Sequence, residues 1–60
     1  MKPSDIGLYR TYEGDKHELR RVILITPDKV RFQIVGITQR IPFEIPVEQF
    51  SKWAKKEAKP

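Results

Sequence analysis

Residues 20–35 read RRVILITPDKVRFQIV, and this stretch decides the fold. In its second half Val30, Phe32 and Ile34 alternate with polar residues. Such alternation predicts a strand with one buried face and one hydrated face. Pro27 and Asp28 are typical of a tight turn, because proline presets φ for the first central position. The stretch is therefore expected to form a β-hairpin.

The first half of the hairpin contains four consecutive apolar residues, Val22–Ile25. Three of them are branched at Cβ, which favours a strand over a helix. An unbroken apolar run does not alternate, so two explanations remain open. Either both faces of the strand are covered, or a bulge or strong bend shifts the facing. Small barrels need such bends, which favours the second explanation.

Two more strands are predicted on either side of this hairpin. A short β-type run ends at a turn around Gly14, and another alternating run ends before Pro46. Pro42 cannot donate a ladder hydrogen bond, so its strand is expected at a sheet edge. The four expected strands are Leu8–Tyr12, His17–Thr26, Lys29–Val35 and Arg40–Ile45.

From Pro46 onward the apolar period becomes that of a helix, which is expected over residues 46–58. Its apolar stripe would close the sheet, and its opposite face would carry Lys52, Lys55, Lys56 and Lys59. The expected core consists of Leu8, Leu19, Ile23, Ile25, Val30, Phe32, Ile34, Ile41, Phe43 and Ile45, closed by Val47, Phe50 and, in one of two readings, Trp53.

The fold class expected from these elements is mainly β with a C-terminal α-helix. Residues 1–7 would be an entry segment, residues 8–45 a sheet and residues 46–58 a helix, together one domain. Four to five short strands with a terminal helix indicate a small curled antiparallel sheet or an SH3-like barrel.

The pattern resembles a family of small, mostly uncharacterised proteins encoded by bacteriophages and prophages. The residues that carry the resemblance are Gly7, Tyr9, Arg10, Val22, Val30, Phe32, Pro46, Phe50 and Lys52. The resemblance implies a phage or prophage origin and an SH3-like fold, but no activity.

Catalytic chemistry is not expected from the composition. The chain has no cysteine and one histidine, His17, whose carboxylate neighbours Asp15 and Glu18 lie at a predicted turn. Ser4 and Ser51 have no histidine–carboxylate partner set. We therefore expect a protein that is not an enzyme, with no catalytic residue, metal, cofactor or small-molecule substrate. With no signal peptide or membrane-length apolar run, a cytoplasmic protein without a membrane partner is expected.

Twelve Lys and Arg against eight Asp and Glu give a net charge of +4, which favours an anionic partner. Arg10, Arg20, Arg31 and Arg40 come one from each of the four predicted strands, and these could form a stripe across one sheet face beside Tyr12. Guanidinium groups bind phosphate and stack on bases. The candidate nucleic-acid-binding residues are Arg10, Arg20, Arg31, Arg40, Lys52, Lys55 and Lys56. The alternative is that these positions are charged only for solubility, since strand register is not fixed by sequence.

Aromatic residues support a second hypothesis, a module that modulates a host protein. Tyr9, Tyr12 and Trp53 would be its anchors, beside the sheet edge marked by Pro42. The alternative interpretation of Trp53 is that it packs in the core. The expected partner is thus nucleic acid or a host protein, and the chain itself a monomer or weak homodimer.

Overall fold

The predicted hairpin forms the centre of the computed structural model, which describes residues 1–38 and 40–58. Strands β2 (Leu19–Ile25) and β3 (Lys29–Ile34) pair antiparallel. Thr26 N donates to Lys29 O at 2.9 Å, and Lys29 N donates to Thr26 Oγ1 at 3.0 Å. These bonds close the turn over Pro27 and Asp28, as the sequence predicted.

A bulge interrupts the pairing of β2 with β3, which confirms the favoured explanation of the apolar run. The register shifts between Val22, opposite Phe32, and Leu24, opposite Arg31, so Ile23 is the extra residue. Val22 is fully buried, whereas Ile23 is half-buried. The prediction of Ile23 in the core was wrong, because the bulge breaks the alternation that would have placed it on the same face as Ile25.

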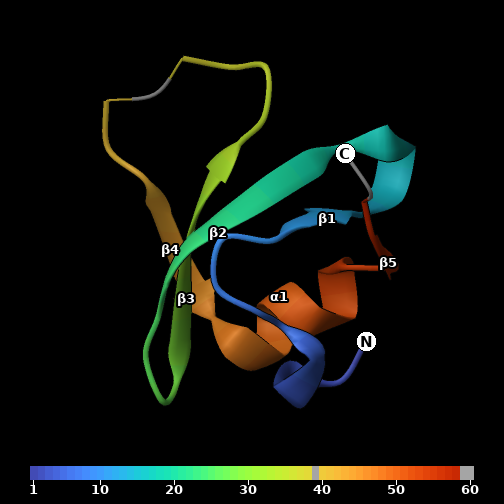
Figure 1. Ribbon diagram of the computed structural model, residues 1–60, viewed down its shortest axis with the longest axis vertical. Coiled ribbons are helices and arrows are strands. Elements are labelled where there is room, and N and C mark those ends of the chain that lie inside the picture. The colour runs from blue at the N-terminus through green and yellow to red at the C-terminus, as the bar shows by residue number, and fades with distance from the viewer. Residues whose placement is uncertain (39, 59–60) are drawn as a thin grey trace.

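Five strands form one antiparallel sheet in the order β4-β3-β2-β1-β5. On one side of the central hairpin lie β1 (Thr11–Glu13) and then the short β5 (Lys56–Glu57), and on the other side lies the edge strand β4 (Phe43–Pro46). Together with one C-terminal helix, this confirms the predicted fold class. Figure 1 shows the sheet curling around that helix.

Three predicted strands were too long at their starts. The first begins at Thr11 instead of Leu8, after the 3₁₀-helix η1 (Pro3–Asp5) and a loop. A second 3₁₀-helix, η2 (Asp15–His17), fills the turn after β1, so β2 begins at Leu19 instead of His17. Similarly, β4 begins at Phe43, which leaves Arg40 and Pro42 in the connection before it.

The helix α1 (Val47–Trp53) is shorter than predicted. Its backbone becomes extended at Ala54, with φ −72° and ψ 121°. Beyond it, Lys55 N donates to Glu13 O at 2.8 Å and Ala58 N donates to Thr11 O at 2.9 Å. Pairing with β1 therefore replaces the further helical turns, and the predicted helix start, Pro46, instead ends β4.

The predicted lysine face of the helix is correspondingly wrong. Lys52 lies on α1, but Lys55 follows the helix and Lys56 belongs to β5. Lys59 lies outside the described residues.

The core lies between the sheet and α1, with η1 beside the helix (Figure 1). We call the sheet face under α1 the inner face and the opposite one the outer face. The ring of Phe50 lies 5.8 Å from Tyr12, 5.4 Å from Phe32 and 5.3 Å from Trp53, measured between centroids. The buried apolar residues are Ile6, Tyr12, Val22, Val30, Phe32, Phe50 and Ala54.

Several predicted core residues lie at the margin or outside. Ile34, Ile45, Val47 and Trp53 pack partly buried against the core, and Leu19 is half-buried. The predictions of Leu8, Ile25, Ile41 and Phe43 were wrong: all four are exposed. The short helix covers only the middle of the sheet, so apolar residues near the strand ends and in connections stay uncovered.

Tyr12 is fully buried, although it was predicted as an exposed anchor. Its hydroxyl donates to Asp5 O at 3.0 Å and accepts from Gly7 N at 2.6 Å. A tyrosine can be buried without penalty when its hydroxyl is bonded in this way. The N-terminal segment therefore folds over Tyr12 and is tied to β1 through it.

Arg20 points to the inner face, where its guanidinium stacks between two rings. Its Cζ lies 4.0 Å from the ring centroid of Trp53 and 4.7 Å from that of Phe32. Its Nε donates to Glu18 Oε2 at 3.0 Å, and its Nη2 lies 2.9 Å from the same oxygen. Trp53 in turn covers Gly14 so closely that a Cβ at that position would collide with the indole ring. Arg20 is thus part of the packing.

Replacing Arg20 by alanine is expected to lower the free energy of unfolding by about 1–2 kcal/mol, the contribution of partly desolvated cation–π contacts. Urea unfolding measures it. The matched control is Arg21→Ala, whose exposed side chain should contribute less than about 0.5 kcal/mol. Equal losses in the two variants would show that the stacking contributes nothing specific.

Candidate functional site

The four predicted arginines do not form a stripe on one face. Arg20 lies on the inner face, whereas Arg31 lies on the outer face with its Nη2 3.4 Å from Glu44 Oε2. Arg10 precedes β1, and its Nη1 lies 3.5 Å from Glu57 Oε1. Arg40 is exposed in the connection before β4. The bulge and the shortened strands separate the four side chains.

Two of the predicted lysines are held by carboxylates near η2. Lys55 Nζ lies 2.7 Å from Asp15 Oδ1, and Lys56 Nζ lies 3.6 Å from Glu13 Oε1. Among the residues that the structure describes, no ion pair involves Lys52.

The contacts near η2 shift the pKa values of two charged groups, Glu13 and Lys55. His17 Nδ1 lies 2.6 Å from Glu13 Oε2, and this hydrogen bond, helped by Lys56, holds the pKa of Glu13 below its ordinary value of 4.5. The stability that Glu13 contributes is therefore present above pH 4.5 and lost as the pH falls through the lowered pKa. The contact with Asp15 raises the pKa of Lys55. These groups hold η2 and β5 together.

The three predicted aromatic anchors have different environments. Tyr12 is buried, and Trp53 is half-buried against Phe50 and Arg20, which agrees with its core reading. Tyr9 is 65% exposed. Of the three, Tyr9 alone therefore presents its ring to solvent.

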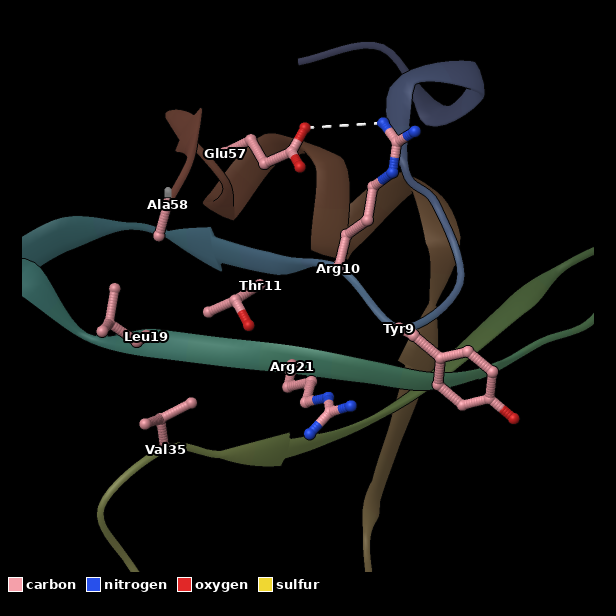
Figure 2. A pocket seen from close by; sticks show the side chains of 8 residues that line it. All are labelled: Tyr9, Arg10, Thr11, Leu19, Arg21, Val35, Glu57 and Ala58. Atoms are coloured by element: carbon pink, nitrogen blue, oxygen red, sulfur yellow. Dashed lines mark hydrogen bonds and ion pairs between the residues drawn. The ribbon is translucent and has the colours of Figure 1, made fainter. Parts of the chain in front are cut away.

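Tyr9 lies at the rim of an open hollow of about 340 Å³ on the outer face, over β1 and β2. Figure 2 shows the Tyr9 ring at one end and the aliphatic side chains of Leu19 and Val35 toward the other, with Arg21 between them. The lining residues are Tyr9, Arg10, Thr11, Leu19, Arg21, Val35, Glu57 and Ala58.

The backbone holds Tyr9 at this rim. Tyr9 N donates to Val22 O, and Val22 N donates to Arg10 O, both at 2.9 Å, so the chain is anchored to β2 before β1 begins. The φ of Tyr9 is 61°, in the left-handed region. A bulky aromatic residue rarely adopts this conformation, which costs about 1–3 kcal/mol. Such strain is typical of functional positions.

Arg21 is the lining cation that sequence reasoning missed. It lies opposite Thr11 of β1 and Gln33 of β3, on the outer face. In the described residues its guanidinium has no ion-pair partner. The available signal was the doublet Arg20-Arg21, because neighbouring strand residues point to opposite faces.

The hollow combines two guanidinium groups, a carboxylate, an aromatic ring and an aliphatic floor. Arg10 turns toward Glu57, and both side chains are largely exposed, so their ion pair is weak. A bound anion can therefore compete with Glu57 for Arg10. The arrangement is suited to binding a phosphate beside a flat ring.

Comparisons of the chain with protein-family models, with curated proteins and with solved structures found no match. Within residues 1–38 and 40–58, no helix has the length and apolar character needed to cross a membrane.

Proposed function

We propose that this chain is a small, basic, non-enzymatic module that binds nucleic acid through the outer face of its sheet. The observation that carries the proposal is the exposed, strained Tyr9 on the same hollow as Arg10 and Arg21. Aromatic rings provide stacking surfaces for bases, and guanidinium groups bind phosphate through paired hydrogen bonds.

Charge on the outer face supports an anionic ligand. Beside Arg10 and Arg21, the face carries Lys29 and Arg31, which share the single carboxylate of Glu44. Lys56 and Glu13, which pair at 3.6 Å where β1 meets β5, lie on the same face. Five cations thus stand against three carboxylates, Glu13, Glu44 and Glu57. An excess of positive charge raises the local concentration of a polyanion and its association rate.

The non-enzymatic role, the SH3-like barrel, the cytoplasmic location and the phage or prophage origin form part of the same proposal. The one imidazole of the chain, on His17, is 92% exposed and pairs with Glu13 at η2, outside the hollow, which supports a non-enzymatic role. The return of β5 beside β1, after the helix, supports an SH3-like, partly open barrel. We retain the cytoplasmic location and the phage or prophage origin as proposals.

A second candidate function, binding of a host protein, is favoured by apolar side chains around the β3–β4 connection. Val35, Ile37, Ile41 and Phe43 are 48–79% exposed and adjoin the edge strand β4. Figure 1 shows the described parts of this connection, residues 35–38 and 40–42, at the end of the sheet away from α1. Uncovered apolar side chains near a sheet edge are typical of interaction surfaces.

The first test compares two variants that each lose one positive charge. Arg21→Gln should weaken binding of a labelled oligonucleotide several-fold and reduce the slope of log affinity against log salt by about one, because a phosphate contact is lost. Fluorescence anisotropy at several salt concentrations measures both. Lys52→Gln, on α1 over the inner face, is the matched control and should change little. No binding by the wild type at low salt, or equal weakening in both variants, would contradict a site on the outer face.

The Arg10–Glu57 pair predicts a gain of affinity. Glu57→Gln removes a negative charge from the hollow and releases Arg10, so the oligonucleotide should bind about threefold more tightly at low salt. Glu48→Gln makes the same change in net charge at an exposed position on α1. If both variants gain equally, net charge explains the effect and the hollow does not.

The second candidate is tested by pull-down from a nuclease-treated lysate. If a host protein binds at the β3–β4 connection, replacing both Ile37 and Ile41 by serine should abolish its capture, because the apolar contact area is lost. The Arg21→Gln variant should still capture that protein. A protein captured equally by all variants, or only before nuclease treatment, would count against this candidate.

A further inference from the structure

We infer that the nucleic acid bound at the outer face is single-stranded, with one base stacked on Tyr9 and the adjoining phosphate at Arg21. This inference rests on the proposed function and specifies its ligand. It follows from the placement of one aromatic ring, one free guanidinium and one aliphatic surface along the same hollow.

The exposed ring of Tyr9 distinguishes single strands from duplexes. In a duplex both faces of every internal base are already covered by the neighbouring bases, so a ring on the protein surface cannot stack on them without unstacking the helix. In a single strand those faces are accessible, and stacking on an aromatic side chain tolerates every base. With 65% of its surface exposed, Tyr9 has a ring available for such stacking.

The placement of α1 also disfavours reading a duplex groove. Among the described residues α1 is the longest helix, yet it has only seven residues. It lies on the inner face, opposite the hollow. Its length of about 10 Å is used in covering the core through Phe50. A groove-reading helix would have to project from the binding face, and the outer face instead presents strands β1 and β2 with a hollow between their side chains.

The order of side chains along the hollow suits two neighbouring nucleotides of a single strand and the phosphate that joins them. Tyr9 stands at one end, Arg21 in the middle, and Leu19 with Val35 at the other end (Figure 2). A base on Tyr9 and a second base against the aliphatic end would place the phosphate between them near Arg21. Arg10, once released from Glu57, can reach the same backbone from the rim.

The experiment measures binding of labelled oligothymidine and oligouridine of about 12 nucleotides, and of a DNA duplex of the same length, by fluorescence anisotropy at low salt. The two single strands show whether DNA or RNA is the source of the ligand. The wild type should bind at least one single strand about tenfold more tightly than the duplex. Tyr9→Leu should remove this preference, while Tyr9→Phe, which keeps the ring, should retain it. Thermal unfolding of both variants checks that they fold.

Three results would overturn the inference, and they are distinguishable. Equal affinity for single strands and duplex, unchanged in Tyr9→Leu, would leave the proposed nucleic-acid binding intact but remove single-strand selectivity. Absence of binding to all three ligands would overturn the proposed function together with its ligand. A single-strand preference that survives in Tyr9→Leu would likewise contradict stacking on Tyr9.

Discussion

The packing of Phe50 against the sheet is the interaction on which the rest of the structure depends. A helix of seven residues is not stable alone in water, so α1 exists because Phe50 is buried among Tyr12, Phe32 and Trp53. The same packing occupies the inner face. Because that face is covered by the core, a ligand can approach the sheet only from the outer face or at its edges. The exposed Tyr9 and the guanidinium of Arg21 lie on the outer face.

The central hairpin was predictable because its signals are local. Alternation in residues 29–34, the Pro-Asp turn and the uninterrupted apolar run each depend on a few neighbouring residues. The length of α1 was not predictable in this way. Its amphipathic period continues past Trp53, but the backbone groups of Lys55 and Ala58 pair instead with a strand more than forty positions earlier. The apolar period of a segment does not show that a strand so distant in the sequence will compete for its backbone hydrogen bonds.

The candidate site was predictable in kind but not in its members. Basic residues and a tyrosine near the first strand pointed to an anionic ligand, and Tyr9, Arg10 and Arg31 do lie on or beside the outer face. Tyr9 and Tyr12 looked equivalent in sequence. Their different burial arises because the N-terminal segment covers Tyr12 and bonds its hydroxyl, a tertiary event. Arg20 was assigned to the site and Arg21 was overlooked because the facing of β2 depends on the register at the bulge.

That bulge has a consequence for recognising related chains. If β2 continued as a regular strand in the register of Leu24, Ile23 would lie opposite Phe32 and Arg21 would turn inward in place of Arg20. Omitting Ile23 altogether would join Val22 to Leu24 and keep both arginines facing as they do. A related chain that lacks a residue at position 23 is therefore compatible with the same core. A related chain with one extra residue between Arg21 and Val22 would instead exchange a packing residue for a surface residue.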